Sequence, residues 1–328
     1  MSDSSGVKKG KGITGVFNLL SPSQKQFLST LSGLLILMLV FTVLSQYFLN
    51  IRNLLIVATQ TAVIAIIAIG QTYVLITGGI DLAIGSNMAL TAMVAGLCMK
   101  ANLPVPFAII SGLFIGVLAG AVSGVLIAFG RLPPFIATLG TMTVARGVAF
   151  TLTQAIPIAN LPKSFTLFGT DSTFGIPNAV IIMVVLVYIF GFILAKTKLG
   201  RHVYATGSNF EAARLSGVNT HKVQMTVYMF SGLLAAFAGL IQAARVVTAQ
   251  PGAGDGYELD AVASSVIGGA STMGGEGTIA GTFIGAFVIG VLRNGLNLVG
   301  VTPHIQRIVI GIVIVGSVFL DKVKGRKD

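Results

Sequence analysis

The stretch GSNFEAARLSG, residues 207–217, has the spacing of a short capped helix. Ser208 or Asn209 can cap its start, and Glu211 would lie in the first turn, where a carboxylate complements the helix dipole. Gly217 can end the helix, because glycine readily takes the left-handed conformation that follows a last turn. The two alanines after Glu211 give a small-residue face that would fit a groove on another protein. An ordinary amphipathic connector between longer helices is the alternative interpretation.

Three arginines, Arg146, Arg293 and Arg307, fall inside long apolar runs. If those runs cross a membrane, a central charge costs on the order of 3 kcal/mol, so Arg146 should face protein or a wet cavity. It would either donate hydrogen bonds to a cargo on a transport path or clamp carbonyls at a helix end. Arg293 and Arg307 lie near the ends of their runs, where a long side chain can reach the interface. Asn294 and Asn297 share a helical face that suits the lining of an aqueous path.

Asp81 follows Gly78 and Gly79 between two apolar runs, and it is the one acidic residue that we place close to a span. It caps the next helix, or it marks an interruption of the kind that transporter sites use. A second glycine-rich interruption, residues 268–277, has the same functional interpretation. Tight helix packing alone would also explain the glycines of both interruptions.

Four glycines, Gly112, Gly116, Gly120 and Gly124, recur every four residues and therefore share one helical face. In a membrane such a face lets another backbone approach closely. We predict a packing role for it. The partner is either a helix of the same chain or a helix of a second copy.

An acidic group, Asp255, Glu258 and Asp260, precedes a later apolar run and is expected on the outer surface. These carboxylates could pair with basic residues of a partner protein. Solvated surface charge is the alternative interpretation.

The sequence patterns of catalysis are missing. No G-x-x-x-x-G-K-[ST] phosphate loop occurs, and no Ser-His-Asp pattern is legible. The histidines His202, His221 and His304 are widely separated, and the single cysteine, Cys98, lies in an apolar run. We therefore predict no catalytic residue, no metal site and no cofactor in this chain. Uphill transport would need energy from another subunit.

The composition is that of a membrane protein. The chain has 328 residues, of which 54% are hydrophobic and only 9% are charged, whereas a soluble domain carries about 25% charged residues. A net charge of +11 could suggest nucleic acid. The basic residues, however, lie in the tails and the connections rather than on one soluble face. This distribution argues against nucleic acid and indicates a lipid bilayer.

Ten apolar runs have roughly the length of a transmembrane helix, since about 20 residues cross the hydrocarbon core. They are residues 28–48, 54–77, 84–99, 106–129, 135–154, 178–195, 223–244, 259–272, 278–299 and 304–320. We predict an all-α, polytopic fold with about ten transmembrane helices in one permease domain, residues 28–320. The runs 84–99 and 259–272 are the shortest.

Charge predicts the orientation. Basic residues concentrate in the tails, residues 1–27 and 321–328, and in the connection 196–222. Positive charge stays inside, so both tails and this connection are predicted to be cytoplasmic, with the connection 155–177 outside. Glycines and arginines recur after five spans, which favours two halves that are inverted in the membrane.

Several segments resemble one family. Glu-Ala-Ala-x-x-x-Gly at 211–217 is similar to the signature by which ABC importer permeases couple to their ATPases. The segments that resemble the ribose-type sugar permeases are GQTYVLITGGIDL at 70–82, PFIATLG at 134–140, ARG at 145–147, AQP at 249–251, GYELD at 256–260, IGG at 267–269 and NGLNL at 294–298. The resemblance runs from about residue 50 to residue 320. One departure is Glu276, where relatives often carry a basic residue.

The resemblance implies the large, ten-span importer type in the bacterial inner membrane. A periplasmic or lipid-anchored binding protein would deliver a monosaccharide, with ribose or a related pentose or hexose as first choice. A separate cytoplasmic subunit would bind ATP and Mg²⁺ and would act through Glu211, Ala212, Ala213 and Gly217. A second permease copy would complete the path, with a homodimer favoured over a heterodimer. The candidate path residues are Gly78, Gly79, Asp81, Arg146, Arg293, Asn294 and Asn297.

Two other classes fit the chain less well. A secondary sugar transporter needs buried coupling carboxylates, which are almost absent, and has no use for the Glu-Ala-Ala segment. A membrane enzyme or sensor needs a reactive cluster or an appended soluble domain, and the sequence has neither.

Overall fold

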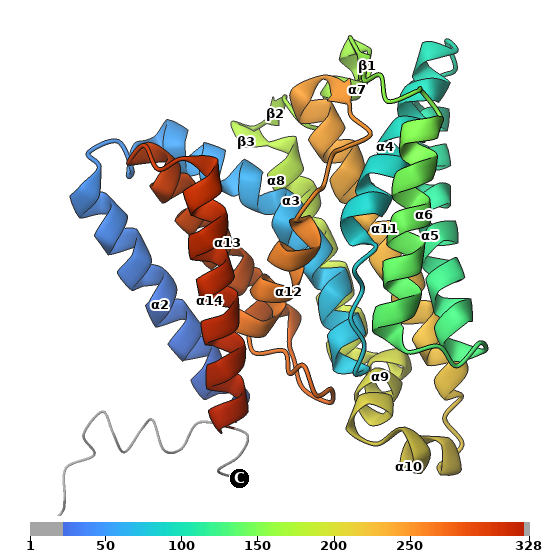
Figure 1. The fold of residues 1–328 in the computed structure, drawn as a ribbon. Coiled ribbons are helices and arrows are strands. Elements are labelled where there is room, and N and C mark those ends of the chain that lie inside the picture. The colour runs from blue at the N-terminus through green and yellow to red at the C-terminus, as the bar shows by residue number, and fades with distance from the viewer. Residues whose placement is uncertain (1–21, 325–328) are drawn as a thin grey trace, which may run out of the picture.

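The computed structural model describes residues 22–324, and these form a bundle of helices (Figure 1). A helix lies at each of the ten predicted apolar runs. These helices are α2 (Pro22–Leu44), α3 (Ile51–Ile76), α4 (Ile84–Lys100), α5 (Val105–Ala128), α6 (Pro134–Thr151), α8 (Asn178–Lys196), α11 (Thr220–Val246), α12 (Tyr257–Ile267), α13 (Ile279–Leu298) and α14 (Pro303–Lys324). The described residues are mainly helical with four two-residue strands, which supports the predicted all-α class in its coarser form.

Short elements cap the two ends of the bundle. At one end, strands β1 (Ile158–Ala159) and β4 (Thr248–Ala249) pair, as do β2 (Ser172–Thr173) and β3 (Ile176–Pro177), and α7 (Lys163–Thr166) lies beside them. Helices α9 (Lys198–Ser208) and α10 (Phe210–Leu215) lie at the opposite end (Figure 1). The two long connections of the chain are therefore at opposite ends of the bundle.

Within the described residues, six helices are long and apolar enough to cross a membrane: α2 from Gln24, α3, α5, α8, α11 and α13. They show a polytopic membrane protein, while the count of ten spans stays a prediction. Helix α12 has only 11 residues, which is about 16 Å or roughly half of the hydrocarbon thickness. The predicted span 259–272 is therefore wrong as a single helix. The chain turns at Gly268 and at Gly269, whose φ is +93°.

The predicted tails overlap two helices. Helix α2 already begins at Pro22, and α14 continues to Lys324. The predicted boundaries at residues 27 and 321 therefore fall inside helices. The remaining tail residues, 1–21 and 325–328, lie outside the described part.

The core is built around α3 and α11. Tyr73 on α3 meets Phe190 and Phe230 edge to face, with ring centroids 6.1 and 5.6 Å apart. Tyr73 also donates a hydrogen bond to the carbonyl of Phe190 at 2.6 Å, so its hydroxyl is satisfied inside the bundle. Large apolar side chains such as Val43, Val144 and Phe192 are exposed on the outer helices. That exposure is what a lipid-facing surface requires.

The four glycines of the predicted packing face are all buried on α5, and the face packs inside the chain. A Cβ on Gly116 would lie 2.5 Å from the carbonyl oxygen of Gly232 and 2.6 Å from the Cβ of Ala236, both on α11. Gly120 and Gly124 approach the α11 backbone in the same way. The glycine face therefore lies against a helix of the same chain, and its packing role stays a prediction.

Replacing Gly116 with leucine should separate α5 from α11, because the new side chain has no space. We expect destabilisation of about 3 kcal/mol or more, at the upper end of overpacking effects. Gly33→Leu is the matched control, since nothing lies within 4 Å of a Cβ there. The measurement is the size-exclusion profile and thermal unfolding of both variants in mild detergent. A normal profile for Gly116→Leu would contradict the packing role.

Candidate functional site

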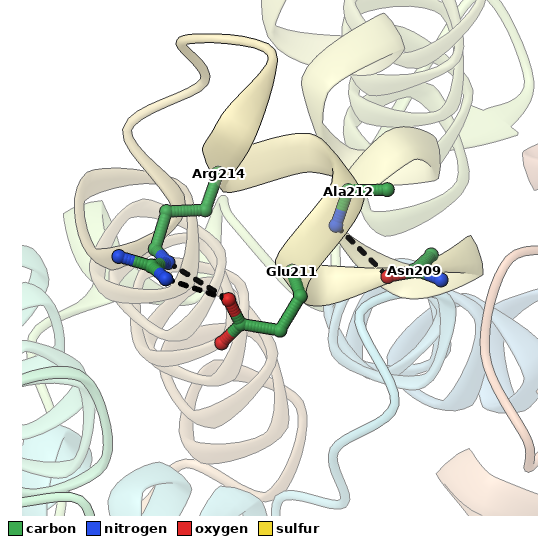
Figure 2. A network of polar contacts seen from close by, with 4 residues as sticks. All are labelled: Asn209, Glu211, Ala212 and Arg214. Carbon is green, nitrogen blue, oxygen red and sulfur yellow. Dashed lines mark hydrogen bonds and ion pairs between the residues drawn. The ribbon is translucent and has the colours of Figure 1, made fainter.

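Helix α10 is the short capped helix that the sequence predicts (Figure 2). The Oδ1 of Asn209 accepts a hydrogen bond from the backbone N–H of Ala212 at 2.9 Å, so Asn209 and not Ser208 is the cap. The helix ends at Leu215, and Gly217 beyond it has φ +86°. Because that conformation strains residues with a Cβ, glycine is required at this position.

The exposed face of α10 carries an ion pair between two residues of the same helix. Glu211 and Arg214 are 2.7 Å apart, and their side chains are 65% and 56% exposed (Figure 2). Leu215 is 81% exposed, whereas Ala213 is buried beneath the helix. The predicted small-residue face is therefore divided, because Ala212 lies outside and Ala213 packs inward. The helix offers a compact surface on which the charges of Glu211 and Arg214 neutralise each other.

Asp81 organises a buried segment that is not helical. Residues 77–83 connect α3 to α4, and Asp81 is only 1% exposed. Its Oδ1 accepts from the N–H of Ala83 at 2.9 Å, and its Oδ2 accepts from the Oγ of Ser231 at 2.6 Å. The cap residue of α4 is Ala83, which makes no side-chain bond. The predicted cap is thus wrong, and Asp81 instead satisfies irregular backbone inside the bundle.

The two glycines before Asp81 serve this segment. Gly78 has φ +78°, and a Cβ on Gly79 would overlap the hydroxyl of Tyr228. That hydroxyl has no hydrogen-bond partner in the described part of the chain, and neither does the Nε2 of Gln71, whose Oε1 accepts from the N–H of Asp81. Sequence reasoning missed Gln71 and Tyr228, because each is a single polar residue in an apolar helix.

Arg146 reaches across to the connection before α12. One terminal nitrogen donates to the carbonyls of Pro251 at 3.0 Å and Ala253 at 2.6 Å. The geometry is that of the clamp interpretation, although the carbonyls belong to a connection and not to a helix end. A role on a transport path is not tested by these contacts.

Arg293 and Asp260 form an ion pair between α13 and α12, in which Asp260 is buried and Arg293 is partly buried. The Nη2 of Arg293 lies 2.5 Å from the Oδ2 of Asp260, and the Asp260 side chain is 1% exposed. The guanidinium carbon of Arg293 also lies 5.7 Å from the centre of the Tyr257 ring. One prediction is therefore wrong, because Asp260 is not on the outer surface. The reason is that α12 starts at Tyr257, so Asp260 falls in its first turn and faces inward. Arg293 bonds to Asp260 with its side chain 32% exposed, and its reach to the interface stays a prediction.

The other charged residues near these helices are more exposed. Arg307 lies 3.7 Å from Asp255, and both side chains are about three-quarters exposed, at 74% and 75%. An exposed pair of this kind contributes little to stability. Glu258 is half-buried. The outer acidic surface thus reduces to Asp255 and part of Glu258.

Asn294 joins two helices. Its amide exchanges two hydrogen bonds of 3.0 Å with the amide of Asn53 on α3, and both side chains are buried. Asn297 is exposed near the end of α13. The prediction that both line an aqueous path is therefore wrong for Asn294, whose amide is engaged in helix packing.

A groove runs between α4, α5 and α6, with a cavity of about 660 Å³. Its walls are almost entirely aliphatic, but Asn87 and Thr141 also line it. Asn87 is 1% exposed, and neither its Nδ2 nor its Oδ1 has a hydrogen-bond partner among the described residues. Sequence reasoning missed this residue, although an asparagine inside the apolar run 84–99 is the signal that could have found it.

Removing one member of the Arg293–Asp260 pair should destabilise the protein strongly. Asp260→Asn leaves a guanidinium without its buried counter-charge, and we expect a loss of about 3 kcal/mol. The double variant Asp260→Leu, Arg293→Met should recover most of that loss, because apolar packing replaces the pair. Thermal unfolding in detergent measures both, with Asp255→Asn as the exposed control. Equal stability of Asp260→Asn and the control would contradict this.

Comparison with known proteins identifies the class. A family model described as "Branched-chain amino acid transport system / permease component" matches residues 53–318. The chain is 44% identical over 299 residues to the ribose import permease protein RbsC of Escherichia coli (strain K12), with 90% of this chain and 93% of that protein covered. It is 45% identical over 302 residues to RbsC of Bacillus subtilis (strain 168), with 91% and 94% covered.

A further relative, the D-allose transport system permease protein AlsC of Escherichia coli (strain K12), is 36% identical over 291 residues, with 88% of this chain and 89% of that protein covered. No solved structure matches. Together with the helical bundle, these findings define a multi-pass permease subunit of an ABC importer. The chain belongs to the permease family that the matching model describes, and the predicted resemblance to ribose-type permeases is confirmed.

Proposed function

We propose that this chain passes a monosaccharide, ribose or a related pentose or hexose, from a binding protein into the cytoplasm, driven by a separate ATPase subunit. The observation that carries the proposal is the identity of 44% to a ribose import permease over nine-tenths of the chain. The description of the family model names amino acids, so the family gives the permease class and the relatives give the cargo. No step of ATP chemistry is placed in this chain.

The proposed assembly follows the same relatives. The chain makes ten spans in the bacterial inner membrane, with both termini and α9–α10 in the cytoplasm. A second copy forms a homodimer with it. The ATPase subunit binds ATP and Mg²⁺ and contacts Glu211, Ala212, Ala213 and Gly217. A periplasmic or lipid-anchored binding protein contacts the opposite end, where β1 to β4 and α7 lie (Figure 1).

Contacts among the described residues support a shorter set of candidate path residues. Gly78, Gly79 and Asp81 shape a buried interruption, and Arg146 clamps another connection. Those four are retained as candidates, together with Asn297, which is exposed. Arg293 and Asn294 act in packing through Asp260 and Asn53. Asn87 joins the candidates, because its free amide lines the groove beside α6.

The proposal is tested by purification and reconstitution. The tagged chain is extracted from its native membrane in mild detergent, and the eluate is analysed by mass spectrometry and for ATPase activity. We expect a stoichiometric ATP-binding partner, with ATPase stimulated by ribose-loaded binding protein. Vesicles are then assayed with ribose, allose and galactose separately. Sugar uptake by an ATPase-free preparation would mean a self-sufficient carrier and would contradict the proposal.

Changes on α10 should separate ATP hydrolysis from transport. In Glu211→Ala the ion pair to Arg214 is lost, and in Gly217→Pro the residue cannot take the observed φ of +86°. We expect normal insertion and at least about a tenfold loss of uptake per ATP, the effect of about 1.4 kcal/mol at the contact.

Arg52→Ala and Gly300→Pro are the matched controls. Arg52 is exposed, Gly300 has φ +77°, and both lie outside α10 and outside the proposed binding-protein contact at β1 to β4 and α7. Full ATP-driven uptake in both α10 variants would remove the coupling role.

Asn87→Leu distinguishes a path residue from a structural one. Removing an unpaired buried amide should raise the unfolding temperature, since its desolvation costs about 1–3 kcal/mol. If the amide meets the sugar on its way, uptake falls while stimulated ATPase persists. Thr143→Leu, at an exposed position on α6, is the control. A more stable variant with unchanged uptake would exclude Asn87 from the path.

A further inference from the structure

Helix α9 is tied by a side chain to the connection between α12 and α13, residues 268–278. The hydroxyl of Tyr204 donates a hydrogen bond to the carbonyl oxygen of Gly277 at 2.6 Å. The two residues are 73 positions apart in the chain. The bond therefore links the element next to α10 directly to the end of a distant pair of helices.

A backbone contact joins the same elements a second time. The N–H of Gly275 donates to the carbonyl of Ile76, the last residue of α3, at 2.8 Å. A Cβ on Gly207, near the end of α9, would overlap that same carbonyl and would lie 2.8 Å from the nitrogen of Gly275. Three backbones thus meet with no side chain between them. Such a junction has little slack, because there is no rotamer to absorb a displacement.

The connection itself is closed and ordered by its own bonds. The N–H of Ser271 donates to the carbonyl of Glu276 at 3.1 Å, which closes a tight loop. Gly274, Gly275 and Gly277 have φ values of +89°, +79° and +149°, which only glycine adopts without strain. These glycines belong to the second glycine-rich interruption in the sequence, residues 268–277. The proposed function does not include them among the candidate path residues.

On its N-terminal side, the connection continues from α12, which leads toward the middle of the bundle. Helix α12 is attached to it and is only 11 residues long. At the other end of α12, a Cβ on Gly85 would overlap the carbonyl of Gly254, so the start of α4 touches the chain before α12 directly. A displacement of the connection therefore reaches the buried start of α4 through one short helix.

We propose that α9 and residues 268–278 form one rigid unit, through which movement of the docked ATPase passes from α10 to α12. Tyr204 is its positioning residue. The inference rests on the proposed function, because it requires an ATPase at α10. It assigns a second receiving element to the coupling step, in addition to the helix that meets the partner.

Tyr204→Phe is the sharpest test, because it removes one hydroxyl and keeps the ring. We expect the ATPase subunit to copurify in the same ratio, since Tyr204 lies on α9 rather than α10. Sugar moved per ATP hydrolysed should fall about fivefold, the equivalent of one hydrogen bond of about 1 kcal/mol. Tyr188→Phe is the control, since Tyr188 is 74% exposed on α8. A merely structural role would lower stability and leave the ratio unchanged, which would overturn the inference.

A distance measurement tests the rigid unit independently. Cys98 is the only cysteine, so a Cys98→Ser background allows spin labels at Arg201→Cys on α9 and at Met273→Cys, both of which are exposed. In the complex with the ATPase, the distance between them should be the same with and without a non-hydrolysable ATP analogue. With Tyr204→Phe added, the distribution should broaden.

The outcomes of the two tests separate the hypotheses. A label distance that changes with nucleotide in the Tyr204 protein overturns the rigid unit. An intact complex in which Tyr204→Phe keeps the normal ratio of sugar to ATP overturns the inference alone. Failure of the unchanged chain to bind any ATPase overturns the proposed function and this inference with it.

Discussion

Irregular backbone inside the membrane is the constraint on which the rest of this structure depends. Hydrocarbon offers no hydrogen bonds, so a non-helical segment at that depth must be satisfied by the protein itself. The chain departs from helix at residues 77–83 and again on both sides of α12. Asp81 bonds to the first of these segments, and Arg146 bonds to the second. Two of the charged side chains within the bundle, Asp81 and Arg146, are therefore explained by what the interrupted backbone requires, whereas Arg293 and Asp260 pair with each other.

Glycines occupy the positions where the backbones of two elements come into direct contact. Gly116 lets α5 lie on α11, which fixes the middle of the bundle, and Gly207 lets α9 lie on the end of α3. The first contact joins two long helices that run antiparallel, since Gly116, Gly120 and Gly124 meet residues of decreasing number on α11. The second joins the element at the docking end to the helices within. Glycine thus allows close backbone contacts both in the centre of the bundle and at the end where the ATPase subunit is proposed to dock.

Much of this could be predicted from the sequence, and the exceptions share a cause. Apolar length located the ten helices, and cap chemistry located α10, because both are local properties of the chain. The inward turn of Asp260 and the pairing of Asn294 with Asn53, 241 residues away, depend on long-range partners. Periodicity carries no information about such partners. Asn87 was missed although an asparagine inside the apolar run 84–99 is a signal, because the lack of a hydrogen-bond partner among the described residues becomes visible only in the folded groove.

The ion pair on α10 determines what kind of contact this helix can offer. Glu211 and Arg214 neutralise one another within a single turn, and the exposed Leu215 lies beside them. A partner that meets α10 therefore gains contact area and shape from this helix rather than net charge. Any long-range attraction would come instead from the exposed basic residues around it, Lys198, Arg201 and Lys222. Salt should therefore slow the first encounter more than it weakens the contact at α10 itself.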